Sequence, residues 1–133
     1  MYNKSLSISC VLAILFFAVS VAFAEVSFDG IYEQVEDAGS TAIYAQDGNT
    51  VYVTGHYVIS GQPRVWYGKG QREGNTISYT YKITVGPSRL AAENKHTGKH
   101  VLTISSDGKT MTGKATASDG TSGAVTMKRK TAR

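Results

Sequence analysis

Hydrophobic and polar residues alternate along much of the chain after residue 25, and no segment has the periodicity of a long amphipathic helix. The clearest alternation lies in 50–60 and 76–85. Successive side chains of a β-strand point to opposite faces of the sheet, so each alternating set forms one apolar surface. The two sets are Val51, Val53, Gly55, Tyr57 and Ile59 in the first segment, and Ile77, Tyr79, Tyr81, Ile83 and Val85 in the second.

The alternating segments of the chain are separated at four points by an acidic residue followed by glycine. These dipeptides are Asp47-Gly48, Glu73-Gly74, Asp107-Gly108 and Asp119-Gly120. Such dipeptides are typical of tight antiparallel turns, because glycine adopts the positive φ that these turns or their bulges require. Extending outward from the turns predicts eight strands. They span 27–35, 40–46, 50–60, 64–71, 76–85, 100–105, 110–117 and 122–129.

A sheet of eight antiparallel strands has two exposed edges unless it closes on itself. The sequence therefore predicts an all-β fold, an eight-stranded antiparallel up-and-down β-barrel, with a two-sheet β-sandwich as the alternative. The short connections favour the barrel. Lys69, Lys82 and Lys114 interrupt the apolar band that a membrane-spanning barrel requires, so we expect no membrane span.

The first 24 residues have the organisation of a secretory signal peptide. Lys4 precedes an apolar run, 10–21, which is shorter than the roughly 18 residues of a membrane span. The small-x-small pattern Ala22-Phe23-Ala24 indicates cleavage after Ala24. We therefore expect a secreted or periplasmic protein with a single domain, 25–133. Cys10, the only cysteine, would leave with the signal peptide, so the domain would have no disulfide.

Charge is distributed unevenly along this domain. Residues 25–62 contain six acidic residues and no Lys or Arg, whereas 63–133 contain thirteen basic and four acidic residues. A basic half can attract anionic partners. In a closed barrel, however, the first and last strands are neighbours, and mutual attraction between them explains the asymmetry more simply.

Two short stretches resemble the calycins, the group of small barrels that includes the avidins and lipocalins. These are Gly30-Ile31-Tyr32 in the first predicted strand and Lys128-Arg129-Lys130 after the last. Calycins typically have Gly-x-Trp in the first strand and a basic residue near the last that packs over the aromatic ring. Tyr32 stands here at the Trp position. The resemblance implies a small apolar or aromatic ligand inside the barrel.

Aromatic residues supply the candidate ligand site. Tyr57, Tyr79 and Tyr81 lie on the apolar faces, and Trp66 lies between Arg64 and Gly68 on one face of its strand. Tyrosine brings apolar area and a hydroxyl that requires a partner, which suits a pocket with some polar specificity. The same rings could equally fill the core. The candidate ligand-binding residues are Tyr57, Tyr79, Tyr81, Trp66 and Arg64, with Arg64 as an anion contact.

Other chemistry is weakly supported. His96 and His100 have the spacing of two helical metal ligands, but Gly98 lies between them and His100 begins a strand, so we expect no metal and no cofactor. Most acidic residues lie in turns, and no nucleophile motif is present, so we expect no enzyme. Basic residues in the tail 127–133 and in the stretch 64–72 could attract nucleic acid, but the predicted secretion of the protein argues against such a partner. We therefore expect no nucleic-acid partner.

The leading function hypothesis is a secreted, non-catalytic protein that binds a small apolar or aromatic ligand in a cavity of about 300 Å³ or more. The alternative is a secreted protein-interaction module or inhibitor that acts through the loop 86–98 and the hairpin tips, with a filled interior. The sequence does not define the oligomeric state, although Tyr52 and Val58 could form an outer contact face.

Overall fold

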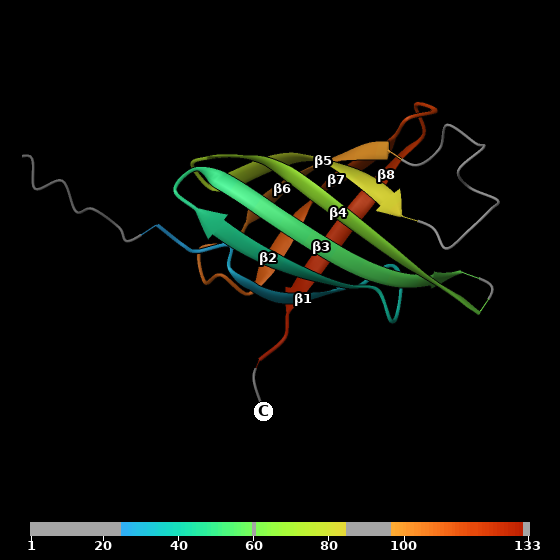
Figure 1. The fold of residues 1–133 in the computed structure, drawn as a ribbon. Coiled ribbons are helices and arrows are strands. Elements are labelled where there is room, and N and C mark those ends of the chain that lie inside the picture. Colours follow the sequence, from blue (N-terminus) through green and yellow to red (C-terminus); the bar gives the residue numbers. More distant parts are fainter. Residues whose placement is uncertain (1–24, 60, 85–96, 132–133) are drawn as a thin grey trace, which may run out of the picture.

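The computed structural model describes residues 25–59, 61–84 and 97–131, and these form an all-β closed barrel of eight antiparallel strands, β1 to β8 in sequence order (Figure 1). The predicted fold class is confirmed, and the sandwich alternative is not. The strands are β1 Gly30–Gln34, β2 Thr41–Asp47, β3 Thr50–Ile59, β4 Gln62–Glu73, β5 Thr76–Thr84, β6 Thr97–Ile104, β7 Thr110–Ala117 and β8 Ser122–Arg129.

The barrel closes where β1 pairs with β8. Tyr32 is opposite Arg129, Glu33 is opposite Lys128, and Gln34 is opposite Met127. Backbone hydrogen bonds extend the pairing at each end of this short ladder, since Lys130 N–H donates to the Ile31 carbonyl at 2.8 Å. Closure brings the acidic start of the chain beside its basic end, and Lys130 Nζ lies 3.9 Å from a Glu33 carboxylate oxygen.

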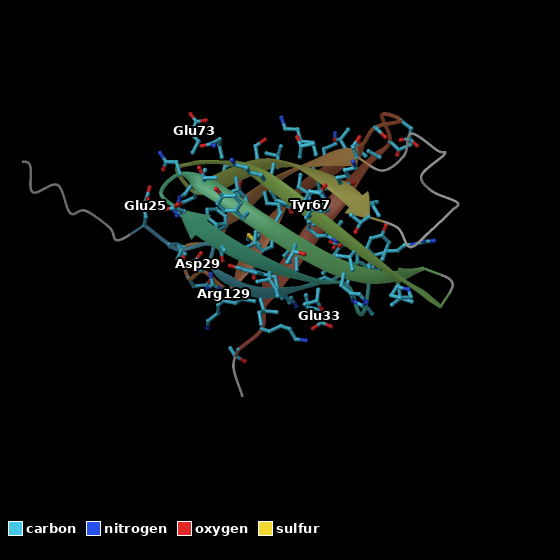
Figure 2. The ribbon with its side chains drawn as sticks, viewed as in Figure 1. Glu25, Asp29, Glu33, Tyr67, Glu73 and Arg129 are labelled. Carbon is cyan, nitrogen blue, oxygen red and sulfur yellow. The ribbon has the colours of Figure 1, made fainter. Side chains whose placement is uncertain are left out.

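The two ends of the barrel differ. At one end, which we call the closed end, the tight turns after β2, β4 and β6 meet the segment 25–29 (Figure 1). At the opposite end, the mouth, β1, β3, β5 and β7 end and β2, β4, β6 and β8 begin. Figure 2 shows Glu25, Asp29 and Arg129 together at the closed end. The segment 25–29 was expected to be strand in part, but it leaves the sheet and crosses this end.

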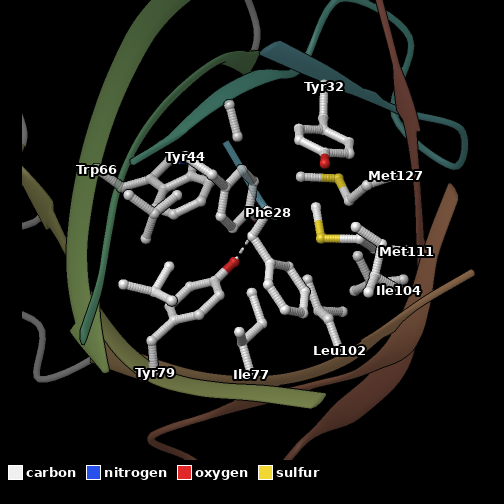
Figure 3. Close-up of a cluster of buried hydrophobic side chains, with 14 residues drawn as sticks. Phe28, Tyr32, Tyr44, Trp66, Ile77, Tyr79, Leu102, Ile104, Met111 and Met127 are labelled. Atoms are coloured by element: carbon white, nitrogen blue, oxygen red, sulfur yellow. Dashed lines mark hydrogen bonds between the residues drawn. The ribbon is translucent and has the colours of Figure 1, made fainter. Parts of the chain in front are cut away.

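Phe28 explains why the segment crosses there. Its side chain is fully buried, and it enters the barrel among the inward residues of several strands (Figure 3). The surrounding core is apolar and continuous. It comprises Phe28, Tyr32, Ala42, Tyr44, Val51, Val53, Trp66, Ile77, Tyr79, Leu102, Ile104, Met111, Val125 and Met127.

Two arginines cover the closed end. The Arg72 guanidinium lies 5.0 Å from the centre of the Phe28 ring, and that of Arg129 lies 5.1 Å from the centre of the Tyr32 ring. Cation–π contacts of this kind are strongest where the cation is shielded from water. Arg129 Nη2 also donates to the Ser27 carbonyl at 2.6 Å and to the Tyr32 hydroxyl at 2.5 Å. The arginines therefore tie 25–29 to the barrel wall.

Several strands differ from their predicted bounds for identifiable reasons. β4 is longer, because the turn before it is tight around Gly61, whose φ is 75°. β6 begins at Thr97 rather than at 100, because Gly98 pairs with Tyr81 and Lys99 with Thr80. The predicted signal peptide, 1–24, and most of the predicted loop 86–98 lie outside the described residues.

Removal of the Phe28 ring tests whether this side chain completes the core at the closed end. Phe28→Ala should lower the free energy of unfolding by about 3–5 kcal/mol, because a large cavity opens in a packed core. Urea denaturation followed by circular dichroism measures the loss. Val65→Ala, at an exposed position of β4, is the control and should change stability by less than about 1 kcal/mol. Equal losses in the two variants would contradict the assignment.

Candidate functional site

A pocket of about 220 Å³ occupies the mouth of the barrel. Its walls come from seven strands and from the connection after β1, so the site exists only when the barrel is closed. Aromatic and aliphatic side chains alternate with polar ones around it, as in small-molecule sites. The lining residues are Gln34, Asp37, Ser40, Tyr57, Trp66, Tyr81, Ile83, His100, Ala115 and Val125.

Glycines on neighbouring strands make room for the two largest rings of the pocket. Gly55 is directly opposite Trp66 across β3 and β4, and a Cβ atom at Gly55 would lie 2.0 Å from the indole. Gly98 is opposite Tyr81 across β5 and β6, and a Cβ there would lie 2.3 Å from the tyrosine hydroxyl. Each ring therefore packs directly against the backbone of a glycine. Any larger residue at that glycine would overlap the ring.

A buried chain of hydrogen bonds lies beneath the pocket. Tyr79 is 1% exposed and stacks under Trp66, with the ring centres 6.3 Å apart and the planes within 5°. Its hydroxyl oxygen is 2.7 Å from that of Tyr44 and 2.6 Å from Nδ1 of His100. The dashed line in Figure 3 marks the bond between the two tyrosines. Of the three residues, His100 alone also lines the pocket.

Burial keeps this chain neutral. Desolvation raises the pKa of Tyr44 and of Tyr79 well above the ordinary value for a phenol, and it lowers the pKa of His100 to about 4. When the neutral imidazole carries its proton on Nε2, Tyr44 donates to Tyr79 and Tyr79 donates to Nδ1. The imidazole then retains one N–H donor, which the chain does not use.

Polar groups surround the rim. Ser40 is buried, and Gln34 and Asp37 line the pocket beside it. Tyr57 is half-buried and lies directly opposite Arg64 across β3 and β4. Burial raises the pKa of Tyr57, and the positive charge of Arg64 partly offsets this effect. The rim thus offers a carboxylate, an amide and hydroxyls around an aromatic interior.

The structure brings the five predicted ligand residues to one end of the barrel but gives them different positions. Tyr57, Tyr81 and Trp66 line the pocket, Tyr79 lies below it in the core, and Arg64 is opposite Tyr57 without lining the pocket. Sequence reasoning did not select His100. The strand alternation contained the signal, because His100 shares a face with the buried Leu102 and Ile104.

The core side chains fill the interior below the pocket, and the pocket is smaller than the cavity of about 300 Å³ expected for a carrier, so it has room only for a molecule about the size of one aromatic ring. A ligand at this site is therefore small. Within the described residues, no three His, Cys, Asp or Glu side chains form a metal-binding group. His96, of the spacing considered for metal, lies outside these residues.

Comparison with known proteins yields no match to a family model, to a curated protein or to a solved structure. Within residues 25–59, 61–84 and 97–131, no helix is long and apolar enough to cross a membrane.

Substitution of Gly55 tests the fit between backbone and indole. Gly55→Ala should displace Trp66, cost about 1–3 kcal/mol of stability and shift the emission maximum of this single tryptophan, because a Cβ atom would overlap the ring. Gly123→Ala is the matched control, since a Cβ there meets no atom within 4 Å. An unshifted spectrum in Gly55→Ala would show that the indole is not held as described.

The buried imidazole predicts a pH dependence of stability. The folded-state pKa of His100, about 4, lies below the ordinary value of 6.5, so only the unfolded chain gains a proton readily between these pH values. Stability should therefore be complete above pH 6.5 and fall by up to about 3 kcal/mol as the pH drops toward 4. Urea denaturation at several pH values measures it.

His100→Gln should remove most of this pH dependence, because the glutamine amide does not titrate. His56→Gln, at an exposed position on β3, should preserve it. Both variants keep Asp37, which lines the same pocket, so the difference between them isolates the contribution of the imidazole.

Proposed function

We propose that this protein is a secreted, non-catalytic binding protein of calycin type that holds a small aromatic molecule in the mouth pocket. The observation that supports the proposal most directly is the combination of Trp66, Tyr57 and Tyr81 around a cavity of about 220 Å³. Aromatic walls select a planar apolar ring, and a few polar groups among them fix its orientation.

The hydrogen-bond chain supports a more specific ligand. His100 is held rigidly by Tyr79 and lines the pocket, so its remaining N–H can donate to an oxygen or nitrogen of the ligand. A fixed donor in a desolvated site favours ligands that satisfy it, since an unpaired buried polar group costs about 1–3 kcal/mol. The best ligand is therefore an aromatic ring bearing one hydrogen-bonding group.

The contact between Arg129 and Tyr32 supports the calycin assignment. The resemblance implied a basic residue over the first-strand ring, and the guanidinium lies 5.1 Å from the centre of the tyrosine ring. Tyrosine replaces the usual tryptophan, and its hydroxyl accepts a hydrogen bond from the same arginine. The contact at the closed end has the form that the resemblance implies, with a smaller ring, and this supports the proposed calycin assignment.

Titration with phenol and with toluene, two rings of similar size, tests the proposal through Trp66 fluorescence excited at the red edge of the indole band. Phenol should bind more tightly than toluene by about five- to a hundredfold, because only phenol pairs with His100. Failure of both compounds to perturb Trp66 would refute the pocket as a ligand site.

Ala115→Leu supplies the matched variant, because Ala115 lines the pocket and a larger side chain fills it. Phenol binding should be lost. Ala124→Leu, at an exposed position on the adjacent strand β8, should bind phenol as the unaltered protein does. Retained binding in Ala115→Leu would place the ligand elsewhere.

A further inference from the structure

Four lysines form a continuous path across the outside of the barrel. Lys69, Lys82, Lys99 and Lys114 lie one on each of β4, β5, β6 and β7, and all four are exposed. Lys69 and Lys99 are both opposite Thr80, Lys82 is opposite Thr97, and Lys114 is opposite Val101. Each lysine is therefore a diagonal neighbour of the next, at a Cα separation of about 7–8 Å. We call these four residues the lysine path.

The described residues do not neutralise the lysine path. In the described part of the chain, no carboxylate makes an ion pair with any of its four lysines. Among the described outward positions of β4 to β7, the only acidic residue is Glu73. Figure 2 shows Glu73 at the closed end. Four like charges this close repel one another, so a bound polyanion would relieve the repulsion.

A hollow with mostly apolar walls overlaps the lysine path, with lining residues from β3, β4, β5 and β6. Its volume is about 600 Å³, and Tyr52, Tyr67, Lys69, Lys82 and Thr80 contribute to its lining. Both tyrosines are about half exposed, and the ammonium of Lys69 lies 5.5 Å from the centre of the Tyr52 ring. The hollow thus combines aromatic faces, ammonium groups and a threonine hydroxyl at one place.

We propose that the lysine path and this hollow bind an acidic polysaccharide, a chain of sugar rings that carry carboxylate or sulfate groups. A sugar ring in the hollow places its C–H face against Tyr67 or Tyr52 and its hydroxyls near Thr80. Its anionic groups, and those of the following rings, pair with successive lysines across the strands. This surface lies on the outside of the barrel wall, whereas the mouth pocket lies inside it, and Tyr81 contributes to the lining of both.

The residue types favour a sugar chain over other polyanions. The path contains only lysine, whereas bidentate recognition of phosphate in nucleic acids is typical of arginine. Thr80, Thr97 and Thr116 each lie opposite a lysine of the path, so hydroxyls and ammonium groups interrupt the exposed apolar residues of this face. A helix that inserts into a lipid surface instead presents one continuous apolar face. The lysine amines match the anionic groups of an acidic sugar, the threonine hydroxyls match its hydroxyls, and the tyrosine rings match its C–H face.

The test compares dextran sulfate with uncharged dextran of the same length by calorimetric titration of the protein. Dextran sulfate should bind with an affinity that falls as salt rises, and dextran should bind far more weakly. Polyphosphate, single-stranded DNA and vesicles containing phosphatidylglycerol are titrated in parallel. If any of these binds as tightly as dextran sulfate at equal charge, the assignment to a polysaccharide is overturned.

Variants separate the charge from the sugar contact. Lys82→Gln with Lys99→Gln should weaken dextran sulfate binding by about two- to fivefold for each lysine and reduce its salt dependence. Lys109→Gln with Lys128→Gln removes the same charge outside the path and should have less than about a twofold effect. Equal losses in the two double variants would show attraction by net charge alone.

Tyr52→Ala with Tyr67→Ala should weaken dextran sulfate binding by about three- to tenfold while leaving polyphosphate binding and the salt dependence unchanged. Loss of binding to both polymers, or to neither, would overturn the role of the hollow. The substituted side chains all point outward, so circular dichroism should show an unchanged fold in every variant.

Discussion

The short pairing between β1 and β8 is the constraint on which the rest of the structure depends. It joins residues near 32 to residues near 129, and it converts a row of hairpins into an enclosed interior. Without it, Tyr32 and Met127 would not face a common core, and the mouth pocket would lose one wall. Arg129 reinforces the pairing with two hydrogen bonds and a ring contact, all made to residues near the start of the domain.

The enclosed interior is divided between two kinds of chemistry. Near the closed end, Phe28, the methionines and the aliphatic residues pack tightly, with no polar group among them except at the arginine caps. Toward the mouth, tyrosine hydroxyls and His100 introduce polarity, but the hydrogen-bond chain satisfies them before the pocket begins. The core therefore supports the pocket as a rigid floor, and the polarity that reaches the ligand is limited to a few groups.

The fold followed from local chemistry, whereas the site did not. Acidic-glycine turns and alternation between them specify hairpins residue by residue, so the eight strands were predictable. Whether an inward ring lines a pocket or fills the core depends on its depth along the barrel, which alternation does not encode. Tyr79 and Tyr81 share one face and differ in that depth alone. Phe28 was also missed, because a single buried ring outside the sheet leaves no periodic signal.

The order of the strands has a consequence for how the chain reaches this state. Most neighbouring strands are joined by short connections and can pair early, but the final ladder links segments separated by almost the whole domain. The high contact order of such a pairing places folding in the range of about milliseconds to seconds. Until β8 arrives, the edges of β1 and β7 remain open to pairing with other chains. Closure thus ends the period in which the nascent sheet is prone to aggregate.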